Sequence, residues 1–366
     1  MHKFFTSSFD ASIYLQQPEQ NAGRDEILEV GKLYYGSTMD IARTLIKFNT
    51  TQISQSIVEN IGTGSYSVFL NLKSANSEEI PLEYTLYANA VSGSWKMGTG
   101  TKFDNITSDG VSWYYLNGSS KWQDLSGSYP AQTDTSSILN GGGGLWYSAS
   151  MASQSFSNEP DDIRMDVTNI VKLWISGSNR LTNDGIILHH HTSASISTDN
   201  DGLDYGILKF FSKETNTIYE PKLELVWDDS LFITGSLTPV TGSASDDYKV
   251  VVTNLKNEYP SNSKVKIRVK GRDMFPYKTF GTTFGYDQAK FLPSGSSYYQ
   301  IEDYITNEVI VPFGDYSKLS CDSTSNYFNL DTSTYAADRV YRLKIKILQN
   351  GITDIIDDKL TFKIVE

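Results

Sequence analysis

Residues 66–73, YSVFLNLK, alternate apolar and polar side chains over their whole length. In an extended strand alternate side chains share a face. The face that would enter a core holds Tyr66, Val68, Leu70 and Leu72. This pattern predicts a β-strand with one buried face.

Similar short segments recur along the chain, separated by turns rich in Gly, Ser, Asn and Asp. The other predicted strands are 43–49, 82–90, 185–190, 205–211, 222–227, 248–255, 264–271, 306–312, 340–348 and 359–365. The segments QNG, 349–351, and DIIDD, 354–358, are predicted turns. We therefore expect an all-β protein.

One segment carries a helical pattern instead. In residues 166–175, DVTNIVKLWI, one helical face holds the apolar side chains of Ile170, Val171, Trp174 and Ile175. Asp166 is the expected N-cap.

A boundary is expected near residues 228–246, where turn residues replace the strand pattern. We predict a jelly-roll β-sandwich over 1–229 and a smaller Ig-like β-sandwich over 230–366. Residues 1–30 are expected to form an N-terminal extension that reaches a partner.

Charge and composition exclude several classes of protein. The chain has 366 residues and a formal net charge of −12. No Lys/Arg cluster stands out in the sequence, so we expect no nucleic-acid partner. Cys321 is the single cysteine, which excludes an intramolecular disulfide. No apolar run approaches the roughly 18 residues of a membrane helix, and the first residues do not resemble a signal peptide.

Three adjacent histidines, His189 to His191, follow the predicted strand at 185–190. Strand geometry places His189 and His191 on one face and His190 on the other. No third ligand stands at a recognised metal-site spacing. Three interpretations stay open, namely strand-end residues without metal, a surface or interface ligand site, and pH-sensitive contacts.

The acidic loop STDNDGLDYG, residues 197–206, superficially resembles a calcium-binding loop. An EF-hand counted from Asp199 would need a glutamate at position twelve, where Phe210 stands. A looser Ca²⁺ site formed by Asp199, Asp201 and Asp204 is the weak cofactor candidate. The alternative is a solvated turn.

No motif for catalysis is present. The chain lacks a nucleophile elbow and a phosphate-binding loop. Its Asp and Glu residues are scattered, and the sequence fixes no pair at a separation that suits glycoside hydrolysis. We therefore expect no enzyme.

Tryptophans at loop-like positions are the candidates for a binding surface. Trp95, Trp113 and Trp122 lie near predicted loops, where an exposed ring could stack on a sugar or contact a protein. The alternative is that these rings are buried core residues. His189 and His191 complete the set of candidate surface residues.

Six segments occur in an order that resembles the DNRLRE-type jelly-roll domain, related to disaggregatase and TGF-β-propeptide-like β-sandwiches. They are 7–31, 43–53, 84–101, 111–123, 165–188 and 210–227. The last two, MDVTNIVKLWISGSNRLTNDGIIL and FFSKETNTIYEPKLELVW, are the strongest part of the resemblance. The family consists of structural and adhesive units of cell-surface proteins and phage particles. The resemblance therefore implies the fold and leaves the function to be argued from sites.

The sequence is most typical of a non-catalytic structural protein of a tailed-phage virion, in the neck, tail, fibre or capsid surface. Its expected partners are other virion proteins, in a homo-oligomer or symmetric assembly, and a host surface glycan. Two alternatives are kept, a carbohydrate-binding or adhesive cell-surface module and a disaggregatase-like glycosidase.

Overall fold

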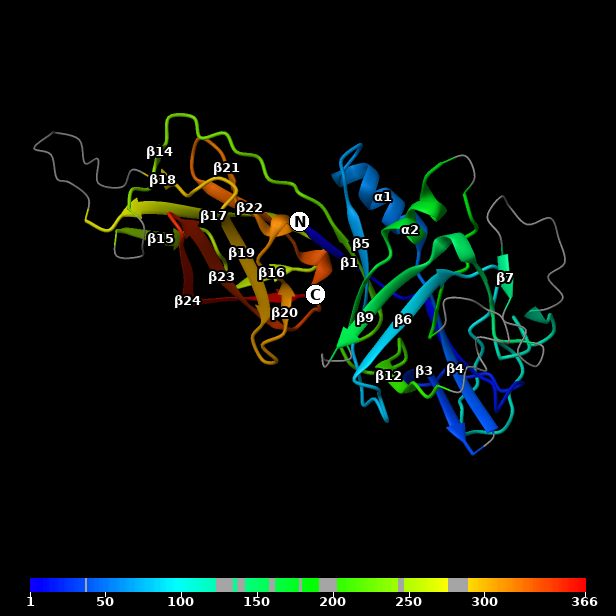
Figure 1. The fold of residues 1–366 in the computed structure, drawn as a ribbon. Helices are drawn as coiled ribbons and strands as arrows, with labels where there is room; N and C mark the ends of the chain where they lie inside the picture. Colours follow the sequence, from blue (N-terminus) through cyan, green and yellow to red (C-terminus); the bar gives the residue numbers. More distant parts are fainter. Residues whose placement is uncertain are drawn as a thin grey trace, which may run out of the picture. The chain divides into compact units, whose positions relative to one another are not determined.

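Strands dominate the computed structural model of the chain (Figure 1). The structure describes residues 1–36, 38–122, 134–136, 142–157, 162–177, 180–190, 203–242, 247–275 and 289–366. The predicted all-β class is confirmed, with two short α-helices among the described residues.

The chain forms two compact units. The N-terminal unit comprises Phe4–Gly62 and Ser67–Leu225, and the C-terminal unit comprises Val226–Glu366 with Met1–Lys3 and Thr63–Tyr66. The change from one unit to the other at Leu225 lies a few residues before the boundary expected at 229.

Two sheets build most of the N-terminal unit. The first has the order β1-β13-β5-β10, and the second has the order β12-β3-β4-β11-β6-β9, with β2 beside β4. A short β7-β8 pair stands apart. The strands are β1 His2–Thr6, β2 Phe9–Tyr14, β3 Ile27–Tyr35, β4 Thr38–Lys47, β5 Ser67–Leu72, β6 Glu83–Ala90, β7 Asp134–Ser136, β8 Leu145–Tyr147, β9 Ala152–Ser157, β10 Ile163–Asp166, β11 Ile186–His189, β12 Gly206–Phe211 and β13 Lys222–Val226.

The alternating segment that predicted the fold forms β5. Val68, Leu70 and Leu72 are buried as expected. On the exposed face, the Arg164 guanidinium lies 3.8 Å from the centre of the Phe69 ring and donates a 2.9 Å hydrogen bond to Glu224. The alternation therefore marks the core face correctly.

Helix α1, Thr50–Asn60, was not expected from the sequence. Its N-cap Asn49 accepts hydrogen bonds from the amides of Thr51 and Gln52, and its core contact is limited to Ile53, Ser56 and Ile57. So few apolar positions give a weak periodic signal. No helix in the described ranges is long and apolar enough to span a membrane.

Helix α2, Thr168–Ile175, confirms the predicted helix but begins later than expected. Its N-cap is Val167 rather than Asp166. The Asp166 carboxylate still accepts a 2.9 Å hydrogen bond from the Thr168 amide. Helices α1 and α2 lie next to each other (Figure 1).

The expected N-terminal extension at residues 1–30 is wrong, because β1, β2 and the start of β3 lie in this segment and pair within the sheets. Strand β1 is the first strand of its sheet, and β2 pairs with β4 over six residues. Ala11 and Ile13 are fully buried. This segment is therefore part of the fold and is not free to reach a partner.

The C-terminal unit is built from two sheets that share one apolar core. One has the order β14-β18-β17-β22-β21, with β15 beside β17, and the other has the order β16-β24-β23-β19-β20. The rings of Tyr299 and Phe328, one from each sheet, stack at 4.2 Å. The strands are β14 Thr238–Pro239, β15 Tyr248–Val252, β16 Glu258–Pro260, β17 Lys264–Asp273, β18 Lys290–Phe291, β19 Ser297–Asp303, β20 Val309–Val311, β21 Ser320–Cys321, β22 Asn326–Asp331, β23 Val340–Gln349 and β24 Ile352–Val365.

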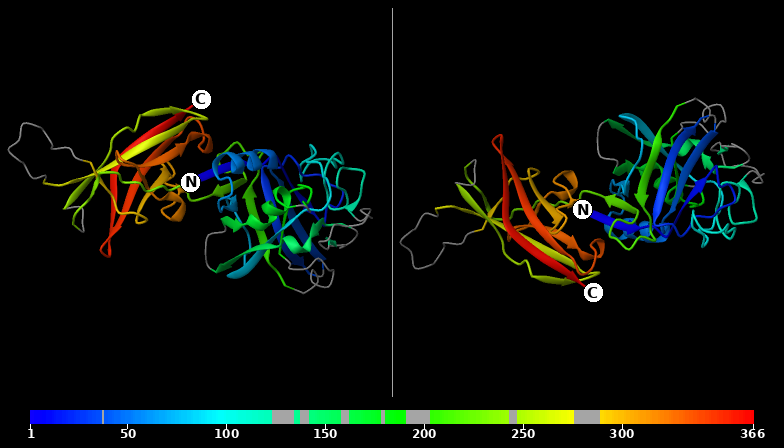
Figure 2. Two further views of the ribbon diagram at one scale, coloured as in Figure 1. Left: turned by 90° about the horizontal axis from the view of Figure 1, so that it is seen from above. Right: turned by 90° about the horizontal axis from the view of Figure 1, so that it is seen from below.

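The β23–β24 hairpin differs in part from the prediction. Asn350 and Gly351 have positive φ angles of 52° and 81° and form the expected tight turn. The second predicted turn, 354–358, is wrong, because β24 continues through these residues with a register irregularity. The hairpin end projects from the rest of the unit (Figure 2).

The buried side-chain amide of Asn21 binds the backbone of residues 97–111, which follow β6. The Asn21 side chain donates 2.7 Å hydrogen bonds to the carbonyl oxygens of Met97 and Val111, and it accepts 2.8 Å from the Gly100 amide. Gly98, at φ +79°, passes so close that a Cβ there would lie 2.3 Å from the Asn21 oxygen. The Asn21 side chain therefore ties residues 97–100 to Val111.

We predict that Asn21→Asp destabilises the protein by about 3 kcal/mol, because a carboxylate oxygen would replace the donor that faces two carbonyl groups. Urea unfolding measures the loss. Asn117→Asp is the matched control, since Asn117 uses only its acceptor oxygen, toward Ser119 and Ser120. Equal stability of the two variants would contradict the role given to Asn21.

Candidate functional site

The candidate tryptophans lie in the interior of the N-terminal unit. Trp95, Trp113 and Trp122 are at most 5% exposed and belong to one apolar cluster. The indole N–H groups of Trp95 and Trp122 donate to the carbonyl oxygens of Asp184 and Ser112. The prediction that these rings offer a binding surface is wrong, and they are core residues.

Trp113 takes part in a stack of four side chains, Trp113, Arg43, Trp146 and His189. The Arg43 guanidinium lies 5.1 Å from the centre of the Trp113 ring and 5.2 Å from that of Trp146. The His189 ring stacks on Trp146 at 4.5 Å. Arg43 also donates a hydrogen bond to the carbonyl oxygen of Gly143. We call this group the cation–π stack.

The histidines do not mark where the strand enters solvent. His189 and His190 are both buried. The Nε2 atom of His189 lies 2.9 Å from the Asn89 side-chain oxygen, and the His190 ring stacks on Tyr205 at 4.9 Å. A surface role for His189 is therefore wrong, and His191 lies outside the described residues.

We predict that Trp113→Ala lowers the free energy of unfolding by about 3–5 kcal/mol, because it opens a cavity beside the Arg43 guanidinium. Phe103→Ala is the control and is expected to change it by less than about 0.5 kcal/mol, since Phe103 is 87% exposed. Chemical denaturation measures both. A loss in Trp113→Ala as small as in the control would place Trp113 at the surface.

The calcium candidate stays untested. Asp199 and Asp201 lie outside the described residues. Asp204 is exposed, and its carboxylate accepts a hydrogen bond from the Gly206 amide, as in a simple turn. Elsewhere in the described ranges, no group of three or more His, Cys, Asp or Glu side chains is arranged to hold a metal ion.

A group of carboxyl residues surrounds Lys102. Its ammonium contacts Glu29 at 2.6 Å and lies 4.3 Å from the centre of the Tyr14 ring, and its backbone amide donates to Asp25. Burial raises the pKa values of Asp25 and of the neighbouring Asp40. Lys102 pairs with Glu29 through its ammonium and binds Asp25 through its backbone amide. We therefore interpret the group as a structural ion cluster.

Asp10 is a buried carboxyl group with a raised pKa. It is 1% exposed, and burial raises its pKa to about 6. One oxygen accepts hydrogen bonds from the Lys213 amide and the Ser7 hydroxyl, while Oδ1 has no hydrogen-bond partner. Ionised Asp10 therefore works against folding at neutral pH.

We predict that Asp10→Asn raises the free energy of unfolding by about 2 kcal/mol near pH 8. With a folded-state pKa of about 6 against an ordinary 3.8, the stabilising contribution of neutral Asp10 is complete below 3.8 and is lost as pH rises through about 6. The gain should therefore disappear toward pH 4. Thermal unfolding across this range measures it, with Asp204→Asn as the exposed control. A gain independent of pH would contradict this account.

The strongest surface feature is a row of cations that the sequence interpretation missed. Lys264, Lys266, Arg268, Lys270 and Arg272 alternate along β17. Ile267 and Val269, between them, are fully buried in the core, so the five basic side chains share the opposite face.

Strand β15 adds a sixth cation. Lys249 pairs directly with Arg272 in the antiparallel register, and Val251 pairs with Lys270. Tyr248 and Val250 enter the core, which leaves Lys249 on the face of the row. We call the six side chains the basic face; they are Lys249, Lys264, Lys266, Arg268, Lys270 and Arg272.

Asp322 neutralises the middle of the basic face. Arg268 donates two hydrogen bonds to its carboxylate, at 3.0 and 3.1 Å, and the Lys266 ammonium lies 3.6 Å away. The hydrogen bonds from Arg268 hold the pKa of Asp322 well below its usual range. The carboxylate therefore stays ionised and fixes the position of both cations.

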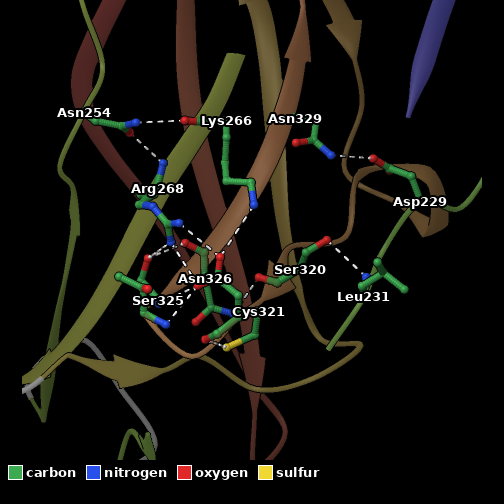
Figure 3. Close-up of polar contacts among 12 residues, drawn as sticks. Asp229, Leu231, Asn254, Lys266, Arg268, Ser320, Cys321, Ser325, Asn326 and Asn329 are labelled. Atoms are coloured by element: carbon green, nitrogen blue, oxygen red, sulfur yellow. Dashed lines mark hydrogen bonds and ion pairs between the residues drawn. The ribbon is translucent and has the colours of Figure 1, made fainter. Parts of the chain in front are cut away.

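The edge of β17 beside Arg268 is closed by a side chain rather than by a strand. Asn254 accepts a 2.7 Å hydrogen bond from the Arg268 amide and donates 2.8 Å to the Lys266 carbonyl oxygen (Figure 3). The backbone there is satisfied, so the basic face presents charge rather than an open strand edge.

The basic face carries more positive than negative charge. Besides Asp322, Asp331 stands opposite Lys264 in the ladder. The side chains of Lys249, Lys270 and Arg272 form no hydrogen bond or ion pair with any residue in the described ranges. Most of the chain's excess negative charge lies in residues 1–225, which hold 25 Asp and Glu against 15 Lys and Arg.

Comparisons with known proteins leave the family open. No protein-family model matches the chain, and no curated protein matches it. Among solved structures, the chain is similar to a DUF4785 family protein from Legionella pneumophila, with 7% sequence identity and a TM-score of 0.21. The match covers 98% of this chain and 65% of that chain. A likeness at this score carries no argument about fold or function.

Proposed function

We propose that the protein is a non-catalytic structural protein that works by docking. The observation that carries the proposal is that side chains of types used in catalysis are engaged in contacts inside the protein. The cation–π stack contains His189, Arg43 and Trp113. Lys102 engages Glu29. Burial raises the pKa of the Cys321 thiol to about 11, which suppresses its nucleophilic form.

The proposed setting is a tailed-phage particle, in the neck, tail, fibre or capsid surface. The low charged fraction of 20% and the single cysteine support it, together with the resemblance of 9–227 to DNRLRE-type domains. We propose a jelly-roll topology for the N-terminal unit and an Ig-like topology for the C-terminal one. Partners would be neighbouring subunits in a symmetric assembly.

The two alternatives differ in what supports them. A carbohydrate-binding module based on Trp95, Trp113 and Trp122 loses its support, because these rings are buried. A disaggregatase-like glycosidase would need two accessible carboxyl groups at a suitable separation. Burial raises the pKa of Asp10 to about 6, but this carboxyl group is only 1% exposed.

We predict that the protein copurifies with intact virions at a fixed ratio to the major capsid protein. Quantitative mass spectrometry of particles through successive density gradients measures the ratio. An abundant host cytoplasmic protein is the control and should fall with each gradient. Absence of the chain from purified particles, or a ratio that falls like that of the control, would overturn the proposal.

A further inference from the structure

We propose that the basic face of β15 and β17 binds a linear anionic polysaccharide, one whose repeating unit carries a carboxylate or another acidic group. The inference does not rest on the virion proposal, since a protein of any setting could use this face.

The first argument is the linear arrangement of the charges. Alternate residues of a strand lie about 6.7 Å apart, so the five cations of β17 extend over about 27 Å. Strand β17 pairs with β15 on one side and β22 on the other, which keeps the row straight and preorganised. An extended polymer that carries one charge per repeat can contact several of these cations at once, and the contacts add through effective concentration.

The second argument is the charge available for a ligand. Asp322 occupies Arg268 and Lys266, whereas Lys249, Lys270 and Arg272 make no ion pair within the described ranges. These three cations lie together, because Lys249 faces Arg272 across the ladder and Lys270 is the next residue on the same face. Close like charges repel one another, and an anionic ligand would relieve that repulsion.

Within the described residues, strands β15 and β17 offer little of what a protein partner needs. Stable protein interfaces have an apolar centre with aromatic anchors. The apolar side chain that β15 contributes to this face is Val251, 36% exposed. A surface of charge without an apolar centre favours a hydrophilic polymer.

The described strands β15, β17 and β22 offer no open aromatic ring for single-stranded nucleic acid. Single strands bind where bases stack on open aromatic rings. Tyr327 stands opposite Arg268 in the ladder, but the Lys266 ammonium covers its ring at 3.9 Å and the side chain is 8% exposed.

The test uses the full chain and polygalacturonate, a linear polyuronate, with neutral dextran and a single-stranded oligothymidine as comparison polymers. Isothermal titration calorimetry measures binding between about 50 and 200 mM salt. We expect polygalacturonate to bind, with affinity that falls steeply as salt rises. We expect dextran not to bind and oligothymidine to bind at least about tenfold more weakly.

The variants locate the site. Lys270→Gln with Arg272→Gln should weaken polygalacturonate binding by about tenfold or more and flatten its salt dependence. The matched control removes the same charge from β24, with Lys359→Gln and Lys363→Gln, and should bind within about twofold of the unchanged protein. If the double variant unfolds, Lys249→Gln tests the same site, because Lys249 is exposed, and it should also weaken polygalacturonate binding.

Three outcomes would overturn the proposal. They are failure of the unchanged protein to bind polygalacturonate, an equal loss of binding in the control variant, and tighter binding of oligothymidine than of polygalacturonate. Absence from virions with intact polysaccharide binding would reject the proposed setting alone, so the two proposals fail separately.

Discussion

The N-terminal unit depends on one buried interaction, the cation–π stack of Trp113, Arg43, Trp146 and His189. It joins β4, β8 and β11 to the segment around Trp113, which otherwise consists of turns. A guanidinium in the interior is costly unless its charge is well solvated by its neighbours. The two indole rings and the Gly143 carbonyl group help to solvate the Arg43 guanidinium. Removal of either ring would therefore leave the buried charge poorly solvated and would destabilise the unit.

Much of the fold could be predicted from the sequence, because a strand that buries one face alternates apolar and polar residues along the chain. The residues 66–73 and 264–271 show it directly, and both form strands. Helix α1 was missed because its small core contact leaves too few apolar positions. Residues 354–358 were taken for a turn because their acidic side chains resemble a loop, although Asp357 pairs with Arg342 within the sheet.

The candidate sites were harder to predict, because whether their side chains are buried or exposed depends on residues far away in the sequence. Trp113 and His189 resemble surface residues until Arg43 and Trp146 are placed between them. The basic residues of β17 were visible as an alternating pattern, but the surplus of charge became evident only when the register set Lys249 opposite Arg272. The protein thus buries Trp95, Trp113 and Trp122 and presents charge on β15 and β17, which is the reverse of the binding surface expected from its sequence.

That reversal is tested most directly by acrylamide quenching of tryptophan fluorescence in the native protein. All six tryptophans are at most 5% exposed, so the account predicts a blue-shifted emission maximum and weak quenching that rises only on unfolding. Efficient quenching of a substantial fraction of the native emission, with a maximum near that of free indole in water, would show that tryptophans face solvent and would contradict the account.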